Sequence, residues 1–440
     1  MPKILFIQPT QYARDGKLCK QKRIHLPGLA FPLLASYTPD NWEIDLRIEV
    51  VDDIPFDSDA DLIAIGTMGH TIFRGLEIAN EFKKRNKTIV MGGYMASMAA
   101  KEAIKHVDSV LIGDGEIAYP RMLNDFERTG KLNQIYEDPI YNLDTLPIPR
   151  YSLLIEKPIG DMLPVQAGRG CQFNCSFCSI ACLYKGKYLF RPVHEVMRDI
   201  KVIKELGFNR FFLIDDNIAS NPKYLEELCK EITPLKMKWA SQCTLQLAGN
   251  PELLSMVTKS GCDLMSFGVE SINQESLNEV NKSWIKASDH AKNLKVLSQA
   301  GIAVSTEMII GTDSDTSQTI KDTLQFINDN RIPLPRFYIL LPIPGSELFS
   351  QIKKEGRLLT ENFKEYDGSK CVHYPKKINP DVLNDQFWWL NRNVFSFKSI
   401  VHRTLFNKYL WKNPKTLMLM VYVNLHYRKY IRRKIVPNIY

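Results

Sequence analysis

Short apolar runs alternate with amphipathic stretches along the first 127 residues. The apolar runs have the length of strands, and the stretches 71–84 and 96–105 have the length of crossover helices. Alternation of this kind predicts a doubly wound, Rossmann-type parallel sheet with helices on both faces, and we assign this α/β domain to residues 1–128. The predicted strands are Lys3–Ile7, Glu43–Val50, Asp61–Gly66, Thr88–Met91 and Ser109–Ile112.

A second alternating series follows residues 129–161, a stretch punctuated by prolines that we expect to be a linker. Six βα units occupy residues 162–345 and predict a partial (β/α)6 barrel of the TIM type rather than a complete eightfold one. Strand signals then stop, and residues 346–440 are predicted to be a helical C-terminal region. The predicted barrel strands are Leu163–Ala167, Arg210–Asp215, Lys238–Cys243, Leu264–Val269, Ala303–Ile310 and Arg336–Leu341.

The composition is that of a globular protein. The chain has 440 residues, of which 45% are hydrophobic and 24% charged, and these values exclude disorder and fibrous repeats. Its apolar runs are too short for a signal peptide or a membrane span. Nine cysteines without a secretion signal favour a reducing compartment, so we expect a cytoplasmic protein.

The net charge of +8 is concentrated near the C-terminus. Residues 391–440 hold 11 of the 57 Lys and Arg and none of the 49 Asp and Glu, with aromatic residues interleaved. Two interpretations remain open: a terminal helix packed on the barrel, and peripheral contact with an anionic membrane surface, which would make the protein membrane-associated. Nucleic acid is not an expected partner, because the rest of the chain is close to neutral.

Three cysteines within eight residues give the strongest chemical signal. Cys171, Cys175 and Cys178 lie in the loop after the first strand of the second series. A structural zinc site usually takes four ligands from two pairs, and the sequence has no second Cys-x-x-Cys. A four-iron cluster held by three thiolates would keep one iron open for catalysis. Five isolated cysteines are expected to be buried apolar side chains: Cys19, Cys229, Cys243, Cys262 and Cys371.

Cys182 leaves an alternative open. As a fourth ligand it would close the cluster and make the protein an electron carrier of the ferredoxin type. The first spacing of three residues, and Leu183 where that run has Pro, argue against this arrangement. We therefore predict that Cys182 is not a ligand.

The motif Cys171-x-x-x-Cys175-x-x-Cys178, with Phe177 before the last cysteine, resembles the signature of radical S-adenosylmethionine (SAM) enzymes. The resemblance implies a [4Fe–4S] cluster whose open iron chelates SAM. It also implies reductive cleavage of SAM to a 5′-deoxyadenosyl radical, and hence an external electron donor of the flavodoxin or ferredoxin type. The six βα units match the partial barrel of that family.

The same resemblance implies a SAM site at the carboxyl ends of the barrel strands. Asp215 and Asp216 lie where the family holds the methionine amine, and Glu270 and Ser271 lie in the stretch that contacts the carboxylate and ribose. Gly311 lies in the turn on the adenine side, and Phe177 completes the implied set. Acidic residues at strand ends are also common helix caps, which is the alternative for each taken singly.

The N-terminal domain resembles the cobalamin-binding domain that precedes the barrel in one large group of these enzymes. The loops with Gly66, Thr67, Gly92, Gly93 and Gly113 would admit the corrin and its nucleotide tail, although any one glycine can be a simple turn-former.

One motif departs from that pattern. Where cobalt-ligating domains have Asp-x-His-x-x-Gly, this chain has Arg23-x-His25-x-x-Gly28, and a ligating His normally needs an orienting acceptor. We predict that His25 is not a cobalt ligand.

The predicted function is cobalamin-dependent methylation of an unactivated centre in a small metabolite or lipid. The main alternative is radical chemistry without methyl transfer, such as cyclisation, rearrangement or carbon–sulfur cleavage. An RNA methylthiotransferase would need a second cluster on three N-terminal cysteines, and only Cys19 is present there. Apart from the cofactor ligands, the sequence identifies no catalytic residue and no particular substrate.

Overall fold

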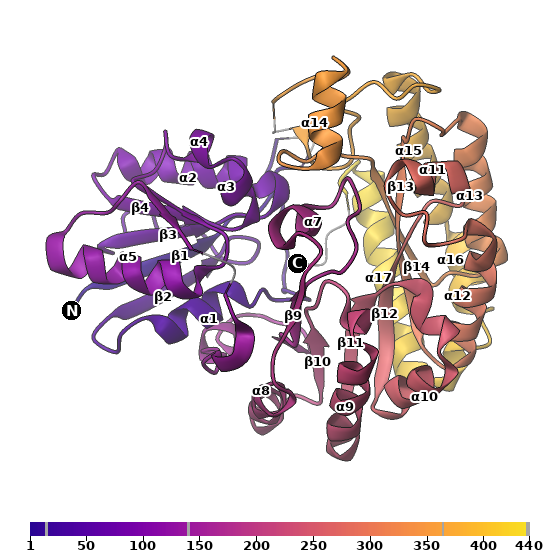
Figure 1. The fold of residues 1–440 in the computed structure, drawn as a ribbon, viewed down its shortest axis with the longest axis horizontal. Coiled ribbons are helices and arrows are strands. Elements are labelled where there is room, and N and C mark those ends of the chain that lie inside the picture. The colour runs from indigo at the N-terminus through magenta and orange to yellow at the C-terminus, as the bar shows by residue number, and fades with distance from the viewer. Residues whose placement is uncertain (14–15, 139–140, 363–364, 437–440) are drawn as a thin grey trace. The chain divides into compact units, whose positions relative to one another are not determined.

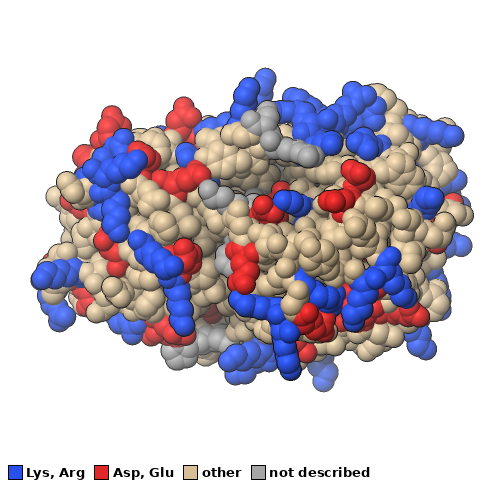
Figure 2. Space-filling view, turned by 90° about the horizontal axis from the view of Figure 1, so that it is seen from above, with Lys and Arg blue, Asp and Glu red and all other residues tan. Residues whose placement is uncertain are grey.

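The computed structural model describes residues 1–13, 16–138, 141–362 and 365–436 and divides into two compact units, Met1–Pro164 and Val165–Asn438 (Figure 1). On the face drawn in Figure 2, basic side chains alternate with acidic ones over much of the surface. No helix within the described ranges is both long enough and apolar enough to span a lipid bilayer.

The first unit is built on a six-stranded parallel sheet in the order β2-β1-β3-β4-β5-β6. The order reverses direction at β1, so the carboxyl ends of β1 and β3 form the switch point at which open α/β sheets bind ligands. The strands are β1 (Lys3–Gln8), β2 (Glu43–Ile48), β3 (Leu62–Gly66), β4 (Thr88–Gly92), β5 (Ser109–Ile112) and β6 (Ile135–Glu137).

Helices cover both faces of this sheet because its central strands are apolar on both sides; Ile4 to Ile7 of β1 are completely buried. The doubly wound prediction is therefore confirmed. The helix predicted over 96–105 is two short helices that meet at Ala99. The helices are α1 (Ala30–Tyr37), α2 (Ile72–Lys83), α3 (Tyr94–Met98), α4 (Ala100–Ala103), α5 (Gly115–Thr129) and α6 (Ser152–Ile155).

The stretch expected to be a linker contains regular secondary structure. Residues 129–161 contain β6, which pairs in parallel with β5, as well as helix α6. Tyr136 is the inward residue of β6, and its hydroxyl donates a hydrogen bond to Asp125 on α5. The strand forms because this one buried ring covers the sheet edge.

The second unit contains a six-stranded sheet in the order β14-β13-β12-β11-β10-β7. Strands adjacent in the sheet are consecutive βα units, and β7 and β14 form its two ends, as the partial-barrel prediction requires. The strands are β7 (Leu163–Val165), β10 (Arg210–Leu213), β11 (Lys238–Cys243), β12 (Cys262–Glu270), β13 (Ala303–Ile310) and β14 (Leu334–Ile339). Around them lie α8 (Val193–Glu205), α9 (Pro222–Ile232), α10 (Pro251–Lys259), α11 (Gln274–Glu279), α12 (His290–Gln299) and α13 (Ser317–Asp329) (Figure 1).

A small antiparallel hairpin between β7 and α8 carries the cysteines. Its strands are β8 (Gly168–Gly170) and β9 (Tyr188–Phe190), and helix α7 (Ser179–Tyr184) lies between them. Gly170 has φ of 85°, and a Cβ there would lie 2.2 Å from the carbonyl oxygen of Lys187. The two strands can therefore approach only if this residue is glycine.

The C-terminal region is helical, as predicted, and packs on the barrel. Its helices are α14 (Glu347–Lys354), α15 (Pro380–Val394), α16 (Phe397–Thr404) and α17 (Pro414–Arg432). Arg403 fastens them together: all of its guanidinium nitrogens donate hydrogen bonds, to the carbonyls of Ile332, Pro333 and Val394 and to the side chains of Ser399 and Asn424.

Candidate functional site

The three-cysteine loop is held by an aromatic stack. Phe173, between Cys171 and Cys175, stacks on Trp284 with ring centroids 3.6 Å apart and an interplanar angle of 9°. Cys171, Cys175 and Cys178 are all half-buried. The stack fixes the middle of the loop without covering the thiols.

The backbone of the loop is tied to two other elements. Ser176 donates its N–H to the carbonyl of Val280 at 3.2 Å and accepts from the N–H of Leu348, on α14, at 3.0 Å. Phe177 is partly buried against an apolar cluster and offers a flat, apolar surface, as the adenine side of a SAM site would need. The cluster consists of Val280, Ile309, Leu340, Leu348 and Ile352.

The three cysteines are better suited to bind a metal cluster than to exist as free thiolate anions. Burial raises the pKa of Cys175 to about 11 and that of Cys178 to about 12, so both are protonated at neutral pH unless a cation replaces the proton. Among the described residues, no three His, Cys, Asp or Glu side chains converge on a single ion. A [4Fe–4S] cluster does not need such convergence, because each thiolate binds its own iron.

Cys182 lies one turn beyond Cys178 on α7. Its thiol donates a hydrogen bond back to the carbonyl oxygen of Cys178, with the two atoms 3.3 Å apart. That contact gives Cys182 a local structural role and supports the prediction that it is not a ligand.

Asp215, at the end of β10, holds the hairpin that carries the cysteines. Its carboxylate accepts the N–H of Ala167 at 3.3 Å and the hydroxyl of Tyr188 at 3.2 Å, so it contacts both sides of the hairpin. Burial raises its pKa to about 8. Asp215 is completely buried, and these contacts suit a supporting role better than direct contact with SAM.

The next two residues face the cysteine loop. Asp216 accepts the N–H of Gly170 at 2.7 Å, and Asn217 lies with its Nδ2 3.8 Å from Cys171 Sγ. Asp216 is half-buried, unlike Asp215 and Asn217, which are buried. Neither residue caps α9, since Asn221 does so.

Glu270, at the end of β12, forms a buried ion pair that the sequence does not reveal. Lys282 Nζ lies 2.6 Å from Glu270 Oε1 and 2.9 Å from the carbonyl oxygen of Gly268. The same ammonium lies 5.6 Å from the centre of the Trp284 ring, which stacks on the cysteine loop. Glu270 has φ of 59°, a left-handed conformation, so the backbone of this turn is strained.

Ser271 is also positioned by a buried residue. Its carbonyl oxygen lies 3.0 Å from Nε2 of His290 on α12, and its hydroxyl accepts the N–H of Asn273. Burial lowers the pKa of His290, so the ring is neutral and can donate from Nε2 to this carbonyl.

Gly311 turns the chain after β13. It has φ of 94°, and its N–H donates to Asp315 at 2.8 Å. His373 is hydrogen-bonded to the Gly311 backbone from the C-terminal region. Sequence reasoning missed His373, His290 and Lys282, because each contacts a residue far along the chain and none belongs to a recognisable motif.

The carboxyl ends of parallel strands lie at one edge of a sheet. Asp216 follows β10, Glu270 ends β12 and Gly311 follows β13, while the cysteine loop follows β7. The predicted SAM residues are therefore brought to the same edge of the barrel as the three cysteines.

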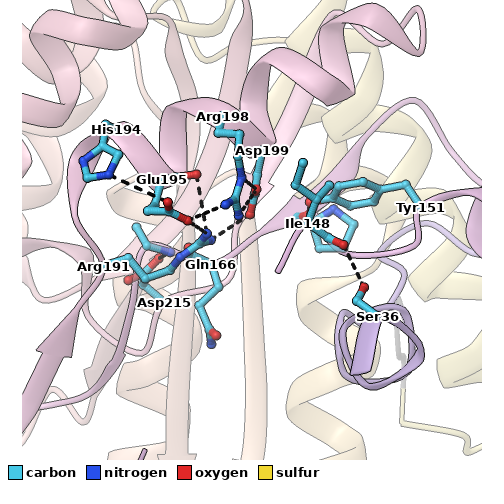
Figure 3. Close-up of polar contacts among 12 residues, drawn as sticks. Ser36, Ile148, Tyr151, Gln166, Arg191, His194, Glu195, Arg198, Asp199 and Asp215 are labelled. Carbon is cyan, nitrogen blue, oxygen red and sulfur yellow. Dashed lines mark hydrogen bonds and ion pairs between the residues drawn. The ribbon is translucent and has the colours of Figure 1, made fainter. Parts of the chain in front are cut away.

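A buried charge network fixes the outer end of the hairpin (Figure 3). Arg191, directly after β9, donates to the carbonyl of Gln166 at 2.9 Å and to Asp199 on α8 at 2.8 Å. Arg198 and Glu195 extend the network along α8. Asp215 and Arg191 thus both hold the open end of the hairpin, where its strands lead to β7 and α8.

The five predicted corrin-binding residues of the first unit end or directly follow β3, β4 and β5. Thr67 is buried, and its hydroxyl donates to the carbonyl of Gly92 at 3.3 Å. Gly93 has φ of 97°, and a Cβ there would lie 2.3 Å from the Thr67 carbonyl oxygen, so packing alone requires this glycine. At Gly66 a Cβ would clash with the ring of Phe31.

At the other two glycines a side chain could be accommodated without a clash. At Gly92 and Gly113 a Cβ would have no heavy atom closer than 3.7 and 3.9 Å respectively. Ser97 joins the two loops, because its hydroxyl accepts the N–H of Gly113 and donates to the carbonyl of Gly93. These contacts bring the two loops together at the carboxyl edge of the sheet, where open α/β sheets bind ligands.

Residues 165–327 match the radical SAM superfamily. The range begins with the second unit and includes the three-cysteine loop. The second unit therefore contains a radical SAM domain, and the chain is an enzyme. Its cofactors include a [4Fe–4S] cluster and SAM, so the resemblance, the enzyme class and these two cofactors are confirmed.

Relatives cover both units of this radical SAM enzyme. It is 29% identical over 398 residues to a bacteriochlorophyllide d C-12(1)-methyltransferase of Chlorobaculum tepidum, covering 88% of this chain and 85% of that one. It is 23% identical over 356 residues to a hopanoid C-2 methylase of Rhodopseudomonas palustris, covering 77% and 67%. The radical SAM methyltransferase TsrM from Kitasatospora setae, solved with cobalamin and a [4Fe–4S] cluster bound, has the same fold with a TM-score of 0.66 at 13% identity, covering 89% of each chain.

The buried ring of His373 makes the enzyme less stable in acid. Burial lowers its pKa to about 4 from the usual 6.5, so below pH 6.5 the unfolded chain binds a proton that the folded chain does not. We expect the free energy of unfolding to fall by up to about 3 kcal/mol between pH 6.5 and 4. Urea unfolding of the apoprotein at pH 7 and 4.5 measures this loss.

Other groups also titrate in this range, so the test needs matched variants. His373→Gln should reduce the difference between the two pH values, whereas the same change at the exposed His194 should leave it as in the wild type. An unchanged pH dependence in His373→Gln would show that the ring is not the source.

Proposed function

We propose that this radical SAM enzyme is a cobalamin-dependent methyltransferase acting on an unactivated centre of a small metabolite or lipid. The observation that carries the proposal is the methyltransferase of Chlorobaculum tepidum, which matches 88% of the chain and therefore both units. The hopanoid methylase supports a lipid or a large apolar ring system as the substrate.

In this proposal each unit binds one part of the cofactor set. When bound, the cluster and SAM supply a 5′-deoxyadenosyl radical, and methylcobalamin supplies the methyl group. Cys171, Cys175 and Cys178 hold the cluster, and Asp216 accepts a hydrogen bond from the SAM amine. The loops with Gly92 and Gly113, at the carboxyl edge of the first sheet, would hold the corrin.

The inner wall of the barrel offers the substrate one polar position. Ser266 on β12 donates to Glu307 Oε1 at 2.7 Å, and Arg336 on β14 donates its Nε–H to the same oxygen at 2.7 Å. These three residues are only half-buried, while Met265 and Phe267, which flank Ser266 on β12, are completely buried. We infer that a polar substituent of an otherwise apolar substrate binds here.

Product analysis tests the proposal. The protein, purified and reconstituted without oxygen, is incubated with SAM, methylcobalamin, a one-electron donor and either a bacteriochlorophyllide or a hopanoid. Methyl transfer requires S-adenosylhomocysteine and 5′-deoxyadenosine to accumulate together. Formation of 5′-deoxyadenosine alone, with a modified but unmethylated product, would instead establish the non-methylating alternative.

We predict that cobalt has no histidine ligand in this enzyme. The position that usually holds an orienting carboxylate is occupied here by the cation Arg23. Burial lowers the pKa of His25, and the charge of Arg23 lowers it further. The electron paramagnetic resonance spectrum of bound cob(II)alamin should lack nitrogen splitting from an axial base. Nitrogen splitting that disappears in His25→Ala would contradict the prediction.

A further inference from the structure

Helix α17 buries one side and exposes apolar residues on the other. Leu417, Met420, Tyr427 and Ile431 are buried, spaced three, seven and four residues apart, so they lie on one face. That face packs against α15, α16 and β14. This side of α17 therefore agrees with the first of the two interpretations of the basic tail, a terminal helix packed on the barrel.

The opposite side carries an apolar row. Met418, Tyr422 and Leu425 are exposed to 65%, 53% and 41%, and their spacing of four and three residues places them on one stripe. Two more exposed rings, Phe406 and Trp411, lie in the segment leading into the helix. Single exposed apolar residues are ordinary, but a row on one helical stripe is not.

Cations stand at both ends of the row. Lys415 lies one turn before Met418, and Lys429 and Arg432 follow Leu425 on the same side of the helix; all three cations are exposed. No Asp or Glu occurs between residues 391 and 440. We call the set Lys415, Met418, Tyr422, Leu425, Lys429 and Arg432 the outer face of α17.

The helix cannot rotate to hide this row. Asn424, on the buried side, donates to the carbonyl of Pro333 at 2.9 Å and accepts from the buried Arg403. Breaking these contacts would leave buried polar groups without partners, which is costly. The outer face is therefore a permanent feature of the surface.

We propose that the outer face of α17 binds the surface of an anionic lipid bilayer. Apolar side chains on one stripe enter the boundary between headgroups and acyl chains, while flanking Lys and Arg meet lipid phosphates and carboxylates. This attachment is peripheral, and it rests on exposure and charge alone, so it is independent of whether the enzyme transfers methyl groups.

Other occupants fit the outer face less well. A second copy of the chain on the same face would bring Lys415, Lys429 and Arg432 against like charges. Single-stranded nucleic acid gains affinity from stacked rings, and Met418 and Leu425, on either side of Tyr422, offer none. An anionic bilayer matches both the apolar row and the cations.

Co-sedimentation of the reconstituted full-length enzyme with vesicles tests the proposal. We expect binding to vesicles containing 30% phosphatidylserine, weaker binding at high salt, and little binding to pure phosphatidylcholine. Met418→Ser/Tyr422→Ser/Leu425→Ser and Lys415→Glu/Lys429→Glu/Arg432→Glu should each weaken binding at least tenfold. Lys101→Glu/Lys223→Glu/Lys259→Glu, which changes the net charge equally at other exposed lysines, should weaken it much less.

Each remaining outcome overturns the proposal. Equal, negligible sedimentation with both vesicle types would leave the outer face as ordinary surface. Equal loss of binding in the control triple variant would mean that net charge, and not this face, attracts lipid. A monomer–dimer equilibrium, or binding to a single-stranded RNA, that disappears in the apolar triple variant while vesicles do not bind would assign the face to another partner. Unchanged thermal unfolding of each variant verifies that the fold is intact.

Discussion

Replacing any one of Cys171, Cys175 and Cys178 by alanine should abolish both the cluster and SAM cleavage. Burial holds the thiols of Cys175 and Cys178 protonated in the absence of metal, and two remaining thiolates do not hold a cubane. Iron and sulfide content should fall close to zero per chain, the broad cluster absorption should vanish, and no 5′-deoxyadenosine should form with dithionite.

Cys182 is the matched control for these variants. It lies one helical turn from Cys178, and its thiol is directed at a backbone carbonyl. Cys182→Ala should therefore retain the iron content and SAM cleavage. Loss of the cluster in this variant would mean that all four thiols are ligands and that the iron has no open position for SAM.

Replacing Lys282 by methionine should cause the largest loss of stability of any change near the site. The ammonium is buried against Glu270 and the Gly268 carbonyl, so its removal leaves a buried carboxylate without a counter-charge. Breaking such a pair costs about 3–5 kcal/mol. The unfolding midpoint of the second unit should drop by on the order of 10 °C. Because Lys282 also supports Trp284 and hence Phe173, less iron should be retained.

Two further variants separate this effect from a loss of surface charge. Lys286, four residues on, is exposed, and Lys286→Met should unfold like the wild type. Glu270→Gln/Lys282→Met removes both charges and should recover part of the lost stability, since the uncompensated carboxylate is gone. A Lys282→Met protein as stable as the wild type would refute the account of the pair.

All strands of the two six-stranded sheets except β6 could be predicted, most of them because they are buried apolar runs bounded by turn residues. Three short strands could not. β6 has a single inward residue, Tyr136, and β8 and β9 pair because Gly168 and Gly170 allow their backbones to approach. Three residues are too few to show a periodicity; β7 is equally short but could be predicted because it lies in the longer, mostly apolar stretch Leu163–Ala167.

The cysteines were predictable because their spacing is itself the chemical signal. The supporting charges were not, because the partners of Lys282, Arg191 and Arg403 are fixed by tertiary packing. Lys282 meets Glu270 across a helix, and Arg403 meets carbonyls, a hydroxyl, an amide and the ring of Phe395. A sequence shows such residues as ordinary surface cations, and only the fold places them in the interior.

The anchoring of the three-cysteine loop bears on how the enzyme is matured. The hairpin and loop are hydrogen-bonded to Asp215, Asp216, Val280 and Leu348, all within the second unit. The glycine loops proposed for the corrin belong to the first unit. Insertion of the cluster into the second unit therefore does not depend on the proposed binding of cobalamin to the first unit, and the two steps can occur in either order. Under the proposed function, a protein that lacks its cluster is therefore still expected to bind cobalamin through its first unit.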